Sequence, residues 1–181
     1  MSDHTNSRYT STLAGLVERQ TGISVTRCYQ CGKCSAGCPA SQAMDYAPSL
    51  LLHHLQAGHA SSDRQVLSSY SIWLCLSCHA CATRCPMEVN LPAIMDVLRG
   101  ESLRQNLVHR HARDIVAFHA SFLDVIGRFG RLWEVGLVAE YKVRTLHIWQ
   151  DVLLVPGMLK RGKLPLWPHR SRKDAAKEIA R

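Results

Sequence analysis

Residues Cys75–Pro86 read CLSCHACATRCP, and an earlier stretch, Cys28–Pro39, reads CYQCGKCSAGCP. Both stretches have the spacing C-x2-C-x2-C-x3-C-P, and together they contain all eight cysteines of the 181-residue chain. Three thiolates at positions i, i+3 and i+6 of a tight loop can converge on three corners of one iron–sulfur cube, and the remaining corner then needs a ligand from elsewhere. In the first run, Gly32 and Gly37 are expected to allow positive φ angles and a close approach of backbone to sulfur.

This doubled run resembles the ligand sequence of bacterial ferredoxins, in which the first three cysteines hold one cubane and the fourth ligates the other. The resemblance implies two [4Fe-4S] clusters, each with four cysteine ligands. The implied ligands of cluster 1 are Cys28, Cys31, Cys34 and Cys85. The implied ligands of cluster 2 are Cys75, Cys78, Cys81 and Cys38.

Two other uses of the cysteines fit the sequence less well. Structural zinc sites typically pair C-x2-C units with four ligands per metal, which matches two triplets followed by C-P poorly. A disulfide framework would need an oxidising compartment, and the polar stretch Met1–Ser7 has no apolar core of the kind that export signals contain. The sequence therefore predicts a cytoplasmic location, where thiolates and low-potential clusters persist.

The formal charge of +8 is unevenly distributed along the chain. Residues 1–98 carry six basic and six acidic residues, whereas residues 99–181 carry sixteen basic and eight acidic residues. Two oxidised cubanes with their thiolates would lower the total to about +4. A basic C-terminal half beside an acidic cluster half favours docking to acidic protein surfaces.

The interval between the two runs decides the fold class, because in small bacterial ferredoxins it is rich in β-structure. Here Pro48 and Gly58 are placed as the first helical residue and the stop of one helix, with Leu50, Leu51, Leu52 and Leu55 on its buried side. One of Ser61, Ser62 and Asp63 is expected to cap a second helix, whose apolar side would hold Val66, Leu67, Tyr70, Trp73 and Leu74 and which would lead directly into Cys75.

Two shorter helical patterns flank the cysteine runs. Ser11–Gln20 has Leu13, Leu16 and Val17 on one face and Gly22 after it. After the second run, Asn90 and Pro92 begin a helix that Gly100 is expected to end. The sequence therefore predicts an all-α fold, an alpha-helical ferredoxin with no transmembrane segment.

Longer apolar stripes follow residue 100. The first stripe comprises Ile115, Phe118, Phe122, Ile126 and Phe129, and the second comprises Leu132, Val135, Val138, Tyr141, Leu146 and Trp149. Gly127 and Gly130 predict a break near residues 127–131. Because a two-cluster core of about 100 residues is already closed, part of this apolar surface is expected to pack on another protein of the complex.

The tail from Lys160 holds eight basic residues. It is interpreted either as a solvated tail or as a docking segment, and membrane contact through Trp149–Leu159 is a further alternative. Nucleic-acid binding is not predicted, since no base-reading or RNA-binding motif accompanies the charge. Within the second run, His79 is expected to form a hydrogen bond in the loop that tunes the cluster potential, because cysteines already fill every iron corner.

The two cysteine runs, the helical insert between them and the trailing helices resemble the HdrC subunit of heterodisulfide reductase. The resemblance covers residues 10–155, and Phe122–Tyr141 also looks like the C-terminal helices of this family. It implies a cytoplasmic electron-transfer subunit of a hetero-oligomer, which relays electrons between an HdrA-like flavoprotein and an HdrB-like catalytic subunit with CCG motifs. This chain has no CCG sequence, so the resemblance implies no catalytic residue of its own.

A bacterial sulfur-oxidising branch of the same family, thought to act on lipoate-bound sulfur, resembles the chain equally well and implies the same relay. From another class, a zinc-stabilised module that binds nucleic acid or protein is the alternative hypothesis, and a self-sufficient oxidoreductase is disfavoured because two clusters use every cysteine. The predicted domains are a disordered segment 1–10, a ferredoxin domain 11–105, a docking extension 106–159 and a basic tail 160–181.

Overall fold

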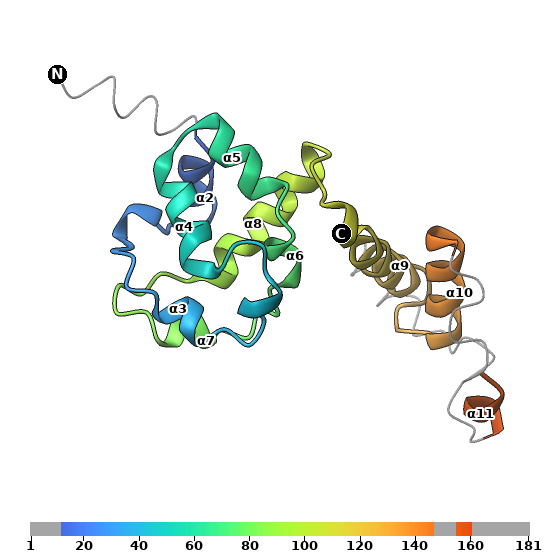
Figure 1. Cartoon of the computed structure of the whole chain (residues 1–181). Helices are drawn as coiled ribbons and strands as arrows, with labels where there is room; N and C mark the ends of the chain where they lie inside the picture. Colours follow the sequence, from blue (N-terminus) through green and yellow to red (C-terminus); the bar gives the residue numbers. More distant parts are fainter. Residues whose placement is uncertain (1–11, 147–154, 161–181) are drawn as a thin grey trace. The chain divides into compact units, whose positions relative to one another are not determined.

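The computed structural model describes residues 12–146 and 155–160 (Figure 1). These residues form helices and loops, with no strand among them, so the predicted all-α fold is confirmed. The predicted disordered segment 1–10, Trp149 and the basic tail beyond Lys160 lie outside the described residues. The α-helices are α2 (Leu13–Thr21), α3 (Lys33–Ala36), α4 (Pro48–Ala57), α5 (Ala60–Leu67), α6 (Ser71–Leu74), α7 (Ala80–Thr83), α8 (Leu91–Arg104), α9 (Arg113–Phe129), α10 (Glu134–Thr145) and α11 (Val155–Lys160). Three short 3-10 turns occupy Val25–Arg27, Ser41–Ala43 and Arg110–Ala112.

The described residues fall into two compact units that divide between Ala112 and Arg113. In the first unit, α8 packs against α2, α5 and α6, while α4 packs against α5 and α3. The core between these helices is aliphatic, as the periodicity predicts. Its fully buried large side chains include Val17, Val25, Leu51, Leu55, Val66, Ile72, Ile94, Met95 and Leu98.

Several predicted helix ends are confirmed by the backbone. Thr12 caps α2 through its hydroxyl, which accepts from the Gly15 N–H, and Gly22 ends this helix in the left-handed conformation. Pro48 stands in the first turn of α4, and Asn90 caps α8 by accepting from the Ala93 N–H. Leu50 is the exception on α4, because its side chain is 43% exposed rather than buried.

The second predicted helix of the insert is interrupted. It begins after His59, none of the three expected residues caps it, and it ends at Leu67 before α6 starts at Ser71. The hydroxyl of Ser102 donates to the Leu67 carbonyl at the end of α5. The carboxylate of Asp45 accepts from the backbone N–H groups of Tyr70 and Ser71, 2.8 Å away in each case, and so starts α6. Side chains distant in sequence therefore create the break.

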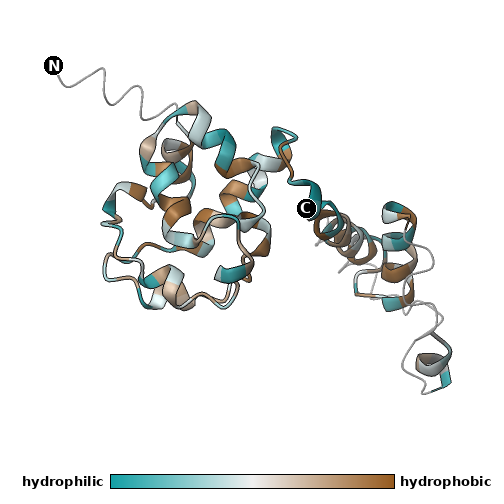
Figure 2. Ribbon diagram, viewed as in Figure 1, coloured by the Kyte–Doolittle hydropathy of each residue, from teal (hydrophilic) through white to brown (hydrophobic). Residues whose placement is uncertain are grey.

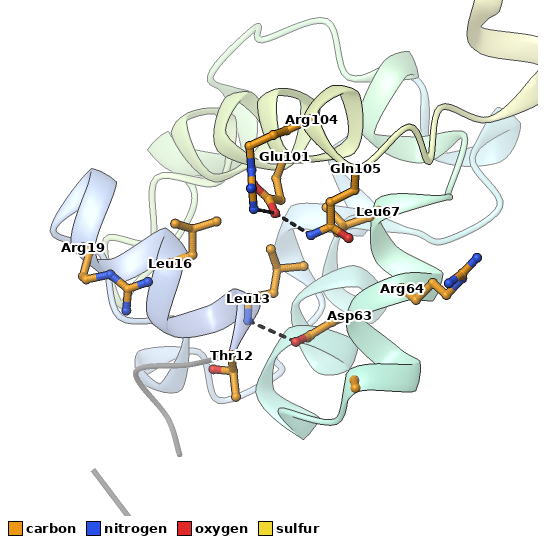
Figure 3. Close-up of a pocket in the computed structure, with 11 residues that line it drawn as sticks. Thr12, Leu13, Leu16, Arg19, Asp63, Arg64, Leu67, Glu101, Arg104 and Gln105 are labelled. Atoms are coloured by element: carbon orange, nitrogen blue, oxygen red, sulfur yellow. Dashed lines mark hydrogen bonds and ion pairs between the residues drawn. The ribbon is translucent and has the colours of Figure 1, made fainter. Parts of the chain in front are cut away.

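Asp63 has a different capping role from the one predicted. Its Oδ2 accepts from the Leu13 N–H at 3.0 Å, so it caps α2, a helix fifty residues earlier (Figure 3). This contact lies in a cavity of about 440 Å³ between α2, α5 and α8. Burial raises the pKa of Asp63, and its Oδ1 has no hydrogen-bond partner among the described residues. On the opposite wall, the Glu101 carboxylate accepts from Arg104 of its own helix and from Gln105, the residue that follows this helix.

Helix α8 continues through Gly100, so the predicted stop at this residue is wrong. A glycine inside a helix costs about 1 kcal/mol of helix stability. Burial of the residues in the turn that follows Gly100 outweighs this cost. In that turn, Ser102 is fully buried and Glu101 is 7% exposed. Tertiary contacts of these residues therefore extend the helix beyond its local signal.

The second unit contains the helical hairpin of α9 and α10. The helix is interrupted at residues 130–133, which agrees with the predicted break near residues 127–131. Phe118 and Tyr141 pack edge to face with their ring centroids 6.0 Å apart, and Arg144 bridges Glu140 and Asp124. Hydrophobic residues recur along both helices (Figure 2). Their large exposed apolar side chains are Phe118, Leu123, Val138 and Val143. No described helix combines the length and apolar character needed to cross a membrane.

Asp45 gives a pH-dependent prediction. Burial tends to raise the pKa of this carboxyl, but hydrogen bonds from the Ser71 hydroxyl and from the N–H groups of Tyr70, Ser71 and Tyr46 outweigh burial, so the pKa is lowered. Its stabilising contribution is therefore complete above the ordinary Asp pKa and is lost as the pH falls through the lower folded value.

We expect Asp45→Asn to lose about 1 kcal/mol of unfolding free energy at pH 7, the usual worth of a helix cap. The difference between the two proteins should shrink as the pH is lowered below about 4, and urea unfolding at a series of pH values measures it. A difference that grows on acidification would contradict this role.

Candidate iron–sulfur site

The two cysteine runs fold into loops of matching backbone conformation. In each loop, the residues before and after the second cysteine have positive φ angles: Gln30 (62°) and Gly32 (75°) in the first, Ser77 (50°) and His79 (61°) in the second. A single helical turn follows in both cases, α3 and α7, and these two turns pack against each other (Figure 1). Three of these four left-handed positions are occupied by residues other than glycine, whose backbones are strained there. Such backbone strain is typical of binding sites.

The packing of α3 on α7 brings the cysteines into two groups. One cavity is bordered by Cys28, Cys31, Cys34 and Cys85. The other is bordered by Cys38, Cys75, Cys78 and Cys81. Each group thus takes three cysteines from one run and the last cysteine from the other. Cys81 also borders the first cavity, so it lies between the two groups.

The donor set of each cavity suits a cluster better than a single ion. All eight cysteines are free, and no three Cys, His, Asp or Glu side chains in the described part of the chain are arranged to hold one metal ion. A zinc site needs four ligands around one point, whereas a four-iron core separates its thiolates. The second cavity is also walled by apolar side chains, among them Met44, Leu91 and Met95, which lower the local dielectric constant.

Backbone N–H groups face several of the sulfurs. The Val89 N–H donates to Cys85 Sγ at 3.3 Å. The pKa of the Cys31 thiol is lowered, first by the backbone N–H of Lys33. Burial raises the pKa of Cys34, and it raises that of Cys81 to about 11. Because thiolates are the ligand form, a metal bound at these two residues would have to displace their protons.

His79 and Gly37 differ from their predicted roles. The side chain of His79 is exposed and the predicted loop hydrogen bond from it is not found among the described residues; the residue instead takes the left-handed conformation that Gly32 has in the first loop. Gly37 has a φ of −102°, so the predicted positive angle is wrong there. A Cβ on Gly37 would lie 2.8 Å from Cζ of Arg84, at the equivalent position of the second run, so the close approach at this glycine is to an arginine side chain and not to the predicted sulfur.

Gly32 gives a second prediction. Its φ is 75° and no other atom lies within 4 Å of where its Cβ would be, so only the backbone opposes a side chain. We expect Gly32→Ala to lower the unfolding free energy by about 1 kcal/mol, and His79→Gly to leave it unchanged or raise it. Urea unfolding followed by circular dichroism measures both variants. Equal losses in the two would show that the loops are not equivalent in backbone.

The sequence prediction missed two residues that hold these loops. Gln56 of α4 donates from Nε2 to the carbonyl of Cys28 at 2.6 Å, and Arg99 of α8 donates from Nη2 to the carbonyl of Cys75. Neither residue lies in a recognisable motif. Each contacts its loop only through the tertiary fold, because it is more than twenty residues away in the sequence. Their positions in otherwise ordinary helices gave no signal in the sequence.

Comparisons with known proteins agree with this geometry. Residues 24–89 match the family model of a 4Fe-4S dicluster domain. The HdrC subunit of the ferredoxin:CoB-CoM heterodisulfide reductase of Methanosarcina acetivorans is 35% identical over 85 residues, which are 47% of this chain and 33% of that protein. The iron-sulfur HdrC subunit of the CoB--CoM heterodisulfide reductase of Methanopyrus kandleri is 29% identical over 101 residues, 56% of this chain and 51% of that protein. An HdrC subunit of Methanocaldococcus jannaschii is 32% identical over 96 residues, 51% of this chain and 50% of that protein.

The aligned part of the chain thus spans between a third and about half the length of these three relatives. Both cysteine runs lie within the matched residues 24–89, which contain the two loops and their helical insert. Residues 24–89 thus match a 4Fe-4S dicluster domain, and the chain is similar to C subunits of heterodisulfide reductases.

Proposed function

We propose that this chain is the electron-transfer subunit of a heterodisulfide-reductase-type complex and holds two [4Fe-4S] clusters. The observation that carries the proposal is the division of eight cysteines into two groups of four, each with one cysteine exchanged from the other run. When bound, a [4Fe-4S] cluster accepts and releases single electrons. The ligands would be Cys28, Cys31, Cys34 and Cys85 in one group, and Cys38, Cys75, Cys78 and Cys81 in the other.

The chain itself would position, insulate and tune the two sites. The exchanged cysteines, Cys38 and Cys85, make each loop a ligand of both groups, so the two sites must be neighbours. Leu91 borders both cavities and excludes water on that side. The N–H groups that face the sulfurs stabilise negative charge on the thiolates.

The partners in this proposal are an HdrA-like flavoprotein and an HdrB-like catalytic subunit that contains CCG motifs. The chain has no CCG sequence, which fits a role between two other proteins. Apolar side chains left exposed on the second unit, including Leu123 and Val143, suit docking within such a complex. The names of the curated relatives favour a heterodisulfide over lipoate-bound sulfur as the substrate of the complex.

Anaerobic reconstitution of the full chain tests the proposal. We expect about eight irons and eight sulfides per chain and, after reduction, an EPR spectrum with interaction between two neighbouring clusters. Zinc in place of iron, or a chain that stays colourless under strict exclusion of oxygen, would refute it.

A further inference from the structure

The two cysteine loops are fastened at the same two backbone carbonyls. Nε2 of Gln56 donates to the carbonyls of Val25 (2.9 Å) and Cys28 (2.6 Å). Nε and Nη2 of Arg99 donate to the carbonyls of Ile72 (2.6 Å) and Cys75 (2.5 Å). In each run these carbonyls belong to the first cysteine and to the residue three positions before it. Gln56 and Arg99 are therefore equivalent clamps on equivalent loops.

The clamps differ in charge. Gln56 is neutral, whereas an arginine is always protonated. The side chain of Arg99 is 19% exposed, so solvent screens its charge only in part. Its counter-ion, Asp96, lies 2.9 Å away but is 66% exposed, and it offsets the charge incompletely.

Other charges near the loops distinguish the two sites less. Arg27 and Lys33 of the first loop are exposed. So are Glu88 after the second run and Asp45, which binds the N–H groups before the second loop. Exposed charges are screened by water and salt. Arg84 directly precedes Cys85, and its side chain packs against Gly37, which directly precedes Cys38. Arg84 is therefore next to one cysteine of each group. Arg99 is thus the partly buried charge that belongs to one loop alone.

We infer that Arg99 gives the group formed by Cys38, Cys75, Cys78 and Cys81 the higher of two reduction potentials. A positive charge beside a cluster site stabilises the reduced form, which carries one more negative charge. An electron that enters the chain therefore comes to rest on the side of the second loop. This inference rests on the proposed function, and it adds the order of the two sites.

EPR-monitored redox titration of the reconstituted full chain tests the order without assigning the signals beforehand. Arg99→Gln converts the charged clamp into a neutral one that keeps an amide donor, and it should shift the higher potential downward while the lower potential stays in place. Asp96→Asn removes the counter-ion and should shift the same potential upward. A purely structural role of the ion pair would not produce shifts of opposite sign.

Arg99→Lys, which keeps the charge, should leave the higher potential closer to the wild-type value than Arg99→Gln does. Arg64→Gln is the control, because Arg64 is exposed and borders neither cysteine cavity. The inference is overturned if Arg99→Gln moves the lower potential or both equally, or if Asp96→Asn fails to raise the higher one. Should Arg99→Gln not retain its clusters, the shift in Asp96→Asn decides the matter. A wild-type chain that binds no iron refutes the proposed function instead.

Discussion

Replacement of Cys38 by alanine is expected to destroy the site of the second run rather than that of its own run. Cys38 borders the cavity of Cys75, Cys78 and Cys81, although it belongs to the first run in sequence. Loss of this ligand opens one iron corner, so we expect about four of the eight irons to be lost. Iron and sulfide determination after anaerobic reconstitution measures the loss, and EPR identifies which signal disappears.

Two further alanine variants give this prediction its controls. Cys78→Ala should lose the same EPR signal as Cys38→Ala, whereas Cys31→Ala should lose the other signal. If Cys38→Ala instead matched Cys31→Ala, each run would hold its own cluster and the exchange of ligands would be excluded. Cys81 is a poor control because it borders both cavities.

Replacement of Gln56 by leucine is expected to have the largest effect of any change outside the cysteines that we predict. The substitution keeps the bulk of the side chain but removes its hydrogen bonds to the first loop. These are the two to the carbonyls of Val25 and Cys28 and a third that Oε1 accepts from the Gln30 side chain. A partly buried hydrogen bond is worth about 1 kcal/mol, and a carbonyl left unpaired adds a desolvation penalty, so we expect a loss of about 2–3 kcal/mol in unfolding free energy. Urea unfolding measures this loss.

The same variant should also lose iron faster than the wild type, because the carbonyl of Cys28 is no longer held by α4. Bleaching of the visible absorbance in the presence of an iron chelator follows that loss. Gln65→Leu is the matched control, since Gln65 is exposed on α5 and borders neither cysteine cavity. Equal bleaching rates in the two variants would show that Gln56 does not hold the loop.

The exposed apolar residues of the second unit follow from the small number of side chains that its two helices bury. Helices α9 and α10 bury few side chains against each other, among them Val125 and Leu137, while Leu123 and Val143 are 66% and 72% exposed. The sequence predicted a docking surface on the two apolar stripes. Phe118, Val138 and Leu146 of these stripes are exposed, whereas Leu123 and Val143 lie outside them. The partner of this docking surface remains part of the proposed function.

Errors in the predicted helix boundaries have a common cause. Residues 68–70 contain no strong helix breaker. A hydrogen bond from Ser102 nevertheless marks the end of α5 there, and hydrogen bonds to Asp45 mark the start of α6. Gly100 is a breaker by propensity, yet the buried residues that follow it keep α8 helical. Propensity acts within a few residues, whereas these hydrogen bonds and packing contacts join residues far apart in the sequence.

Local patterns were enough to predict the all-α class, because the hydrophobic period, helix caps and prolines act within a few residues and need no knowledge of the rest of the chain. The spacing of each run lets three thiolates aim at a common point, and the resemblance to bacterial ferredoxins implied that the fourth cysteine ligates the other group. The side chains that hold the loops, in contrast, could be identified from the folded chain but not from the sequence. Gln56 and Arg99 act across the fold, and whether a side chain reaches a carbonyl depends on helix packing that no local pattern records.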